Sequence, residues 1–459
     1  MIYKQISLYD AIENKCDSLL RRTAISTQFH EPKTITFIDL FSGIGGMRIG
    51  FMKACENKKF IAKCVFTSEI KQHAIQVHQQ NFPNETVHGD ITKIDTKNIP
   101  DFDFLLAGFP CQAFSSAGKR LGFLDTRGTL FFDVERILRE KKPFGFVLEN
   151  VEGLVNHDRK SKDDKIGRTL SIILDSLENL GYKVSWRVLD AKKFGVPQER
   201  KRVYIVGTRK ETPNIDAFGE KNELLSSILE SGLPCEESRF IDLLLSHYRI
   251  EELYGRSIKD KRGGKNNIHS WDIELKGSVT DEQKELLNIM LRERRKKKWA
   301  EYYGIDWMDG MPLTTDHIRT FYNNENLECM LQDLVEKKYV TKEHPKRLVN
   351  NKRIQDRELP AGYNIVAGKK SYEISKILDP GRLAPTLVAM DMQHLFVVDN
   401  QGLRRLSLRE GLRLFGFPDN FRFEIDQELG YDLLGNTVVV PVITSVSERV
   451  LAIYEEAAI

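Results

Sequence analysis

The first half of the chain alternates between short apolar runs and amphipathic stretches. The apolar runs are rich in β-branched and aromatic residues and predict strands, whereas spacings of three and four residues predict helices. Strands that alternate with helices are typical of an open, largely parallel sheet covered by helices on both faces. We predict strands at 34–41, 62–68, 102–108, 144–151, 184–191 and 202–208, and helices at 47–54, 72–80, 129–140 and 167–180.

This alternation stops near Lys210 and gives way to a long region richer in charge, Gly, Asn and aromatic residues. A compact helical pattern returns at Leu406, and an apolar helix is predicted from Val438 to Ala457. We therefore expect one α/β domain that is interrupted by a large insertion. The predicted division is an N-terminal extension (1–33), the first part of a catalytic domain (34–210), the insertion (211–385) and the completing part of the catalytic domain (386–459).

Composition supports an ordinary soluble protein. The chain has 459 residues, of which 41% are hydrophobic and 29% charged, enough for two domains. No apolar run approaches the roughly 18 residues that span a membrane, and residues 1–30 lack an apolar signal core. We therefore expect a cytoplasmic protein without a membrane partner.

Charge alone does not indicate a nucleic-acid partner, because the formal net charge is only +3. Basic residues are nevertheless concentrated between Gly255 and Lys298, and they include the run 292–298. Such a run is most often a solvated helix face, and contact with a polyanion is the alternative. Candidate contacts to such a polyanion are residues 256–265 and 292–298 and four aromatic residues: Trp299, Tyr302, Tyr303 and Trp307.

The six cysteines lie far apart without a Cys-x-x-Cys pair, which predicts free thiols and neither a zinc site nor disulfides. One of them has an informative position. Cys111 ends the segment Gly108-Phe109-Pro110-Cys111, which directly follows an apolar strand. A strand that stops at Gly and Pro delivers the next side chain to the carboxyl edge of the sheet, where open α/β sheets bind ligands. Cys111 is therefore a candidate nucleophile, although a lone Cys is more often a small buried hydrophobe.

A glycine-rich turn at Asp39–Gly46 joins the first strand to the first helix. Glycines let the backbone approach a ligand closely, and a helix N-terminus presents free N–H groups. The spacing differs from G-x-G-x-x-G, which favours a cofactor without a pyrophosphate. Glu69 ends the second strand, where a carboxylate can accept ribose hydroxyls. Asp90 follows Gly89 at a further strand end between the predicted strands 62–68 and 102–108, and it could reach an adenine amino group.

Charged residues at two further strand ends complete the candidate chemistry. Glu149 ends an apolar strand and lies beside Cys111 if the two strands are neighbours. Partial burial would raise its pKa and make it a proton donor or hydrogen-bond partner; a surface acid is the alternative. Alternation places Arg200 and Arg202 on one face. Two guanidiniums there could hold a phosphate or a substrate carbonyl, whereas alone they would indicate a surface edge strand.

Together these segments resemble the motif set of the cytosine-C5 DNA methyltransferases, in that family's order. The resemblance covers about 34–210 and 380–458, and the region between corresponds to the family's variable target-recognition domain. It implies a Rossmann-like, S-adenosylmethionine-dependent methyltransferase sheet with an inserted target-recognition domain. The motif segments are Asp39–Gly46, Gly108–Gln112, Glu149–Val151, Gln198–Arg202, Leu434–Val440 and the element Pro385-Thr386-Leu387.

The resemblance also implies roles for individual residues. Cys111 would attack C6 of a cytosine flipped out of duplex DNA, Glu149 would protonate or hydrogen-bond N3, and Arg202 would hold O2 with Arg200 nearby. No metal is expected. The implied contacts to S-adenosylmethionine are Phe41, Ser42, Gly43, Ile44, Gly45, Gly46, Glu69, Ile70, Asp90, Ile91, Pro110, Leu130, Asn436 and Thr437. The implied DNA contacts are Gln112, Ser115, Lys119, Arg120 and Thr386, with a glycine-containing loop at 114–127 as a lid.

The expected function is modification of a specific DNA site, as the protective half of a bacterial restriction–modification pair. Its partners would be duplex DNA and, functionally, a cognate endonuclease; we expect a monomer associated with the nucleoid. Two alternatives stay open. Methylation of transfer RNA is disfavoured by the size of the insertion, and an inactive DNA-binding relative is disfavoured by the intact Cys111, Glu149 and arginine pair.

Overall fold

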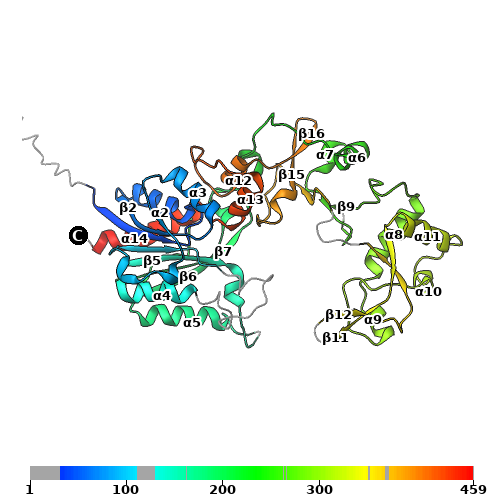
Figure 1. Cartoon of the computed structure of the whole chain (residues 1–459), viewed down its shortest axis with the longest axis horizontal. Coiled ribbons are helices and arrows are strands. Elements are labelled where there is room, and N and C mark those ends of the chain that lie inside the picture. Colours follow the sequence, from blue (N-terminus) through cyan, green and yellow to red (C-terminus); the bar gives the residue numbers. More distant parts are fainter. Residues whose placement is uncertain are drawn as a thin grey trace, which may run out of the picture.

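Figure 1 shows the computed structural model of the chain. The structure describes residues 32–110, 130–161, 163–261, 263–264, 266–349, 352–366 and 372–457. Most of the predicted N-terminal extension therefore lies outside the described residues. So do Cys111 and four of the predicted DNA contacts, Gln112, Ser115, Lys119 and Arg120.

A seven-stranded sheet forms the centre of the first lobe, and it confirms the predicted fold class. Five neighbouring strands run parallel, while β7 is antiparallel to both of its neighbours. The parallel strands are connected through helices, as βαβ units require. In spatial order the strands are β3 (Val87–His88), β2 (Ile61–Ser68), β1 (Thr34–Leu40), β4 (Phe104–Ala107), β5 (Gly145–Val151), β7 (Lys201–Thr208) and β6 (Lys183–Asp190).

Helices cover both faces of this sheet because successive strand residues point to opposite sides. In β4, Phe104 and Leu106 pack into one buried cluster, and Leu105 and Ala107 pack into the other. The first cluster is covered by α2 (Gly46–Asn57), α3 (Gln72–Asn81) and α14 (Val440–Ala457), and the second by α4 (Leu130–Lys141) and α5 (Arg168–Asn179).

The C-terminal helix α14 completes the fold against α2. A Cβ atom on Gly50 of α2 would lie 2.6 Å from Cβ of Ile443, so the glycine permits the two helices to approach closely. Within the described part of the chain, one helical stretch, Gln427–Glu456, is long and apolar enough to cross a membrane. Most of it is buried in this core, as expected for a core helix of a globular domain.

The insertion forms two further bodies. A five-stranded sheet, in the order β16-β15-β14-β8-β9, packs around its own apolar cluster with α6 (Arg239–His247) and α7 (Ile250–Leu253). The predicted boundary at residue 385 falls between strands of this one sheet. These strands are β8 (Ser257–Ile258), β9 (Asn267–Ile268), β14 (Lys376–Ile377), β15 (Leu395–Asp399) and β16 (Gly402–Arg405).

A distal lobe lies beyond this sheet, on the right in Figure 1, and has its own apolar cluster. Its described residues form four helices and two separate two-stranded sheets. The helices are α8 (Asp281–Glu293), α9 (Lys298–Tyr303), α10 (Thr315–Arg319) and α11 (Leu327–Glu336). The paired strands are β10 (Val340–Glu343) with β13 (Gly362–Ile365), and β11 (Lys346–Val349) with β12 (Lys352–Gln355).

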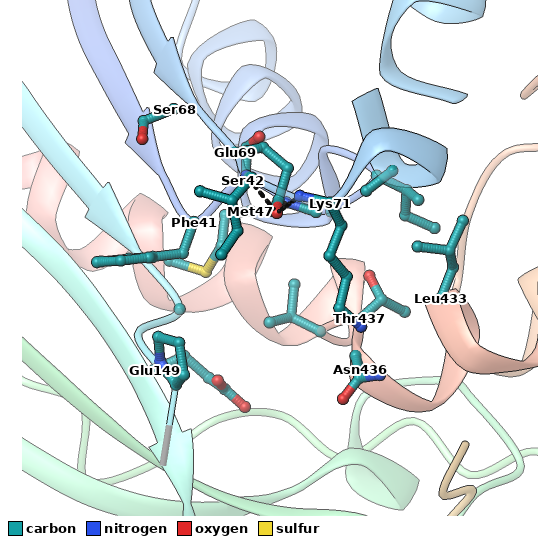
Figure 2. A pocket seen from close by; sticks show the side chains of 18 of the residues that line it. Phe41, Ser42, Met47, Ser68, Glu69, Lys71, Glu149, Leu433, Asn436 and Thr437 are labelled. Atoms are coloured by element: carbon teal, nitrogen blue, oxygen red, sulfur yellow. Dashed lines mark hydrogen bonds between the residues drawn. The ribbon is translucent and has the colours of Figure 1, made fainter. Parts of the chain in front are cut away.

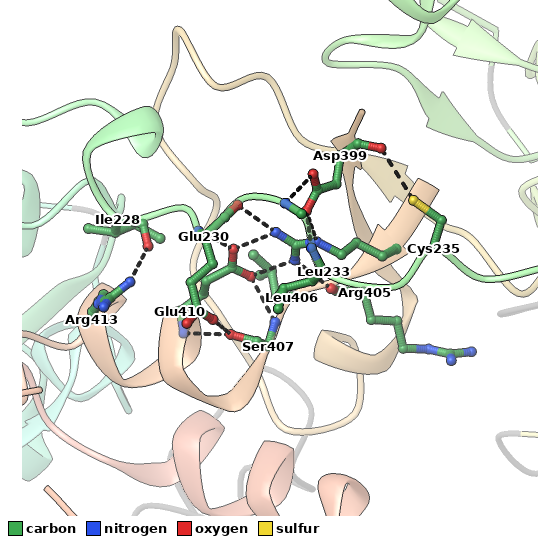
Figure 3. A network of polar contacts seen from close by, with 12 residues as sticks. Ile228, Glu230, Leu233, Cys235, Asp399, Arg405, Leu406, Ser407, Glu410 and Arg413 are labelled. Carbon is green, nitrogen blue, oxygen red and sulfur yellow. Dashed lines mark hydrogen bonds and ion pairs between the residues drawn. The ribbon is translucent and has the colours of Figure 1, made fainter. Parts of the chain in front are cut away.

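The chain leaves the seven-stranded sheet for the insertion in one segment and returns in another. A buried ionic network joins these two segments (Figure 3). Arg404 donates to Asp399 at 2.8 Å and to both carboxylate oxygens of Glu410 at 2.8 and 2.9 Å. Arg404 also donates to the carbonyl of Glu230, while Asp399 accepts the N–H of Gly232. The outgoing segment near 230 and the returning segment 399–410 are thus held by one guanidinium.

The returning chain then forms α12 (Leu408–Leu414) and α13 (Gln427–Asn436) before α14. Ser407 is the N-cap of α12. Ser407 and Glu410 form a reciprocal capping box, in which the Ser407 side chain accepts the N–H of Glu410.

Candidate active site

A cavity of about 290 Å³ opens at the carboxyl ends of the parallel strands (Figure 2). This is where open α/β sheets bind ligands, and the volume is near the lower end of the range for small-molecule sites. Every predicted cofactor residue except Gly45 lines it. Eight further lining residues are not among the predicted cofactor contacts, although Glu149 was predicted as a catalytic residue and Gly108 lies in a predicted motif. They are Met47, Ser68, Lys71, Ala74, Gly108, Glu149, Leu433 and Val438.

The glycine turn that follows β1 forms the floor of the cavity. Phe41, Gly43 and Gly45 have φ angles of 55°, 54° and 88°, in the left-handed region. Glycine adopts this region without steric cost, whereas Phe41 is strained there, as residues at functional sites often are. A Cβ on Gly46 would lie 2.9 Å from Cγ2 of Val438, so only glycine permits this close approach of the opposite wall.

Glu69 fixes this turn to the end of β2. Its Oε2 accepts the N–H of Gly43 at 2.8 Å, and its Oε1 accepts the N–H groups of Ile70 and Lys71, also at 2.8 Å. A carboxylate offers about four acceptor positions, so Oε2 retains capacity for a ligand hydroxyl. The residue predicted to bind ribose therefore also shapes the loop around it.

Next to Glu69, the cavity is lined by the carboxylate of Asp90 and by the apolar side chains of Ile70 and Ile91. Asp90 caps the short helix η1 (Ile91–Lys93) and accepts the hydroxyl of Thr92 at 2.8 Å through Oδ1. The Thr92 hydrogen bond lowers the pKa of Asp90 and keeps it ionised. Ile91 is buried, whereas Ile70 is 67% exposed at the cavity. An exposed apolar side chain beside a carboxylate suits a flat base that carries an amino group.

The opposite wall is the C-terminal end of α13. Asn436 donates to the carbonyl of Asp432 at 2.7 Å, and the Asp432 carboxylate accepts from Lys71 at 2.9 Å and contacts His73 at 3.2 Å. Figure 2 shows Lys71 running from the β2 side toward Thr437. These contacts tie the wall that carries Asn436 and Thr437 to the strand that carries Glu69.

At the other end of the cavity, β4 and β5 are neighbouring strands. Glu149 was predicted to lie beside the segment that leads to Cys111 if these two strands were neighbours, and they are. The pair Ala107 and Leu148 places Gly108 opposite Glu149, whose Oε2 lies 3.8 Å from a Cβ built on Gly108. Cys111 itself lies outside the described residues. The chain is described up to Pro110, which lines the cavity.

Glu149 is buried and lies beside both predicted arginines. Its Oε1 is 3.2 Å from Nε of Arg202. Burial raises the pKa of Glu149, although the positive charges of Arg202 and Arg200 act in the opposite direction. A carboxyl group in this environment can carry a proton closer to neutral pH than an exposed one, as a general acid requires.

The two arginines that the sequence paired have different surroundings. Arg202 contacts Glu149, whereas the buried Arg200 donates to the carbonyls of Leu387, Gly435 and Thr437 at 2.8, 3.2 and 2.9 Å. Arg200 therefore holds the wall that carries Thr437. Burial and the neighbouring Arg202 lower the pKa of Arg200, so the carbonyl partners help to stabilise its charge.

Gln198 is a supporting residue that the sequence analysis quoted only as part of a motif. It is buried, donates to the carbonyl of Leu414 at 2.9 Å and accepts the N–H of Leu387 at 3.4 Å. The hydroxyl of Thr386, the predicted DNA contact, donates to the carbonyl of Glu199. Thr386 is thus held beside the segment that carries Arg200. Thr386 is exposed to solvent.

Four cysteines belong to the described part of the chain, and none of these four lines the cavity. Burial raises the pKa of Cys55 to about 12 and that of Cys64 to about 11, so both stay protonated at neutral pH. Cys235 and Cys329 are exposed elsewhere. Among the described residues, no group of three or more His, Cys, Asp or Glu side chains could hold a metal ion.

Comparison with known proteins agrees with this geometry. The family model for C-5 cytosine-specific DNA methylases matches residues 35–452. The chain is 64% identical over 417 residues to Type II methyltransferase M.NlaIV of Neisseria lactamica, covering 91% of this chain and 99% of the relative. It is 42% identical over 439 residues to Type II methyltransferase M.BanI of Aneurinibacillus aneurinilyticus, covering 90% of this chain and 95% of the relative.

Proposed function

The chain belongs to the C-5 cytosine-specific DNA methylase family and is a DNA (cytosine-5)-methyltransferase, and from this premise we propose how its site works. The substrate is a cytosine within a specific duplex DNA site, and the methyl donor is S-adenosylmethionine. A stacked base cannot present C6 to an enzyme nucleophile, so the cytosine is flipped into the site at a cost of a few kcal/mol.

The cavity fits the proposed methyl donor. Glu69 has acceptor capacity for ribose hydroxyls at Oε2, and Asp90 is an ionised acceptor for the adenine amino group beside the exposed Ile70. The turn around Gly43 presents backbone close to the ligand, with Asn436 and Thr437 on the far side. S-adenosylmethionine, when bound, supplies the electrophilic methyl group.

The protein residues activate the cytosine. The thiolate of Cys111 adds to C6, which breaks the aromaticity of the ring and makes C5 nucleophilic. Glu149 donates a proton or hydrogen bond to N3, so that charge pushed into the ring is neutralised. Arg202, which contacts Glu149, holds O2. Once C5 carries the methyl group, its proton is lost to a base. The C–H bonding pair then re-forms the C5=C6 double bond and expels the thiolate of Cys111, which releases 5-methylcytosine.

One observation carries this assignment: Glu149 lines the same cavity as the proposed cofactor residues while its carboxylate contacts Arg202. A buried acid with a raised pKa, a cation beside it and a cofactor pocket in front of it are the parts that this chemistry needs. Arg200 has a positioning role in this mechanism, because its donors are directed to backbone carbonyls of the opposite wall.

We further infer that the enzyme is the protective half of a restriction–modification system, since its relatives are named Type II methyltransferases. A cognate endonuclease is then a functional partner, the enzyme acts as a monomer on cytoplasmic DNA, and residues 211–385 recognise the target. Thr386 is proposed to contact DNA next to the catalytic edge.

Bisulfite sequencing of plasmid DNA from cells that express the chain tests the function and reveals the site in one experiment. We expect 5-methylcytosine at one defined sequence on duplex DNA, and the same purified protein should transfer labelled methyl groups to plasmid. Label that appears only in transfer RNA, or unmodified plasmid with an inactive purified protein, would contradict the proposal.

A further inference from the structure

The two strands β11 and β12 form an exposed ribbon on the distal lobe. Within the described residues, this antiparallel pair is joined to no other strand. All of its residues are exposed except Lys346, which is half-buried. A two-stranded ribbon is only marginally stable alone, so contacts with the lobe must hold it in place.

One face of the ribbon is anchored to the lobe. Arg353 donates to the carbonyls of Asp306 and Trp307 at 3.0 and 2.8 Å, and Lys346 lies 2.9 Å from the carboxylate of Glu343. Leu348 is the cross-strand partner of Arg353 and therefore shares this face. The ribbon is thus held from one side.

The opposite face carries Arg347, Val349, Lys352 and Ile354, since the pairs Arg347–Ile354 and Val349–Lys352 alternate with the anchored pairs. Val349 is 46% exposed and Ile354 is 53% exposed. Charge normally protects exposed edge ribbons. On this face two apolar side chains lie between Lys352 and Arg347, and Arg347 forms an ion pair with Asp356. These two side chains leave apolar surface on this face that is available to a partner.

Much of the basic run that the sequence singled out is engaged within the distal lobe. Arg294 is buried and donates to Asn364, while Arg295 and Lys296 form ion pairs with Asp309 and Glu293. Of the aromatic candidates, Trp299 is buried, whereas Tyr302 is 71% and Trp307 is 40% exposed. The interpretation of this run as a solvated or structural segment therefore fits better than direct DNA readout.

We propose that the face formed by Arg347, Val349, Lys352 and Ile354 enters the major groove of duplex DNA and helps to select the recognition sequence. The major groove admits a two-stranded ribbon, cations there contact guanine or phosphate, and apolar side chains contact the thymine methyl group. Figure 1 places β11 and β12 on the edge of the distal lobe that faces the catalytic sheet. The proposal rests on the proposed function, which supplies duplex DNA as the substrate.

A paired substitution tests this inference in the full-length protein. The ribbon variant is Lys352→Ala/Ile354→Ala. The matched control is Lys63→Ala/Ile61→Ala on β2, where Lys63 is exposed and Ile61 is 50% exposed, close to the value for Ile354. The probes are a duplex with the sequence that the wild-type protein methylates, duplexes with single base-pair changes, and S-adenosylmethionine alone for calorimetry.

We expect the ribbon variant to lose roughly tenfold or more in kcat/KM on the correct duplex, as the loss of base contacts predicts. Its methylation profile should broaden toward sites with one changed base pair, while binding of S-adenosylmethionine stays at the wild-type level. The control should match the wild type in all three measurements.

The inference is overturned if the ribbon variant keeps the wild-type profile, whether its rate is unchanged or uniformly reduced, because uniform loss indicates phosphate contact without readout. A change in the sedimentation of the free protein with an unchanged profile would instead assign the ribbon to self-association and also overturn it. A wild-type protein that methylates no duplex would overturn the proposed function together with this inference.

Discussion

The guanidinium of Arg202 lies 3.2 Å from the carboxylate of Glu149, at the edge of the sheet where the cofactor cavity ends. A cation beside a carboxyl group ordinarily lowers its pKa, yet burial outweighs Arg202 here and raises the pKa of Glu149. The pair therefore combines a carboxyl group that can hold a proton with a cation that can orient a carbonyl oxygen.

Replacing this carboxyl group should slow methyl transfer more than it affects the fold. Glu149→Gln keeps the shape and a hydrogen-bond donor but cannot transfer a proton, so we expect kcat to fall by roughly 10²–10⁴-fold. Binding of S-adenosylmethionine should persist. Single-turnover methylation assays measure the effect, with the exposed Glu152→Gln as the control. A variant with wild-type kcat would show that Glu149 has a structural role only.

The proposed nucleophile can be tested in the same assay. Cys111→Ala should abolish methyl transfer while DNA binding, measured by gel shift, stays largely intact, because only the covalent step is lost. Cys329→Ala is the matched control, since Cys329 is exposed on α11 in the insertion. If the Cys111 variant still methylates DNA, the covalent mechanism is wrong.

The sequence predicted the catalytic sheet well because buried parallel strands are continuous apolar runs. The run at 34–41 became β1, and the run at 144–151 became β5, each within about one residue. Cofactor residues such as Phe41 and Glu69 were also predictable, since they follow directly on β1 and β2 and the carboxyl ends of parallel strands meet at one edge. Asn436 and Thr437 lie at the end of α13, and only the family resemblance indicated them. Their roles in binding stay predictions.

The insertion could not be predicted in this way. Its strands are short; β14 has two residues, and β11 and β12 are exposed on both faces, so they show no apolar periodicity. Contacts between residues far apart in the sequence could not be predicted either. Alternation placed Arg200 beside Arg202, but the partners of Arg200 at Leu387 and Thr437 come from segments that only the fold brings together.

The close approach at Gly46 predicts a specific loss of cofactor affinity. In Gly46→Ala the new Cβ would lie 2.9 Å from Cγ2 of Val438 and 3.0 Å from Oγ1 of Thr437, so the far wall must shift. Overpacking of this kind costs about 1–3 kcal/mol, and we expect a matching drop in S-adenosylmethionine affinity by calorimetry. Gly89→Ala near the same cavity meets no atom within 4 Å and is the control. Equal affinities of the two variants would contradict this account.

The network around Arg404 predicts that the stability of the junction with the insertion depends on this one side chain. Arg404→Ala leaves the buried carboxylates of Asp399 and Glu410 without their cation, and removal of one partner from a buried ion pair typically costs about 3–5 kcal/mol. The exposed pair Arg319–Glu328 is the comparison, since Arg319→Ala should cost less than about 1 kcal/mol. Urea denaturation measures both variants, and equal losses would show that the network adds nothing to stability.

Asp39 is buried at the end of β1 beneath the glycine turn, and it should make the stability of the fold depend on pH. Burial raises the pKa of Asp39 to about 7, although Arg48 opposes the change. Between the ordinary carboxyl pKa and about 7, the folded protein keeps a proton that the unfolded chain releases, so stability falls as pH rises through this window.

Asp39→Asn carries no titrating group and should lack this contribution. Relative to the variant, the wild type should lose up to roughly 4 kcal/mol of unfolding free energy between about pH 4 and pH 7, with little further change above that. Urea denaturation at several pH values measures the difference between the two proteins. Asp101→Asn is the control, because the Asp101 side chain is 94% exposed and its removal should leave the pH profile unchanged. Parallel pH profiles for wild type and Asp39→Asn would show that Asp39 ionises in the folded state as it does in the unfolded chain.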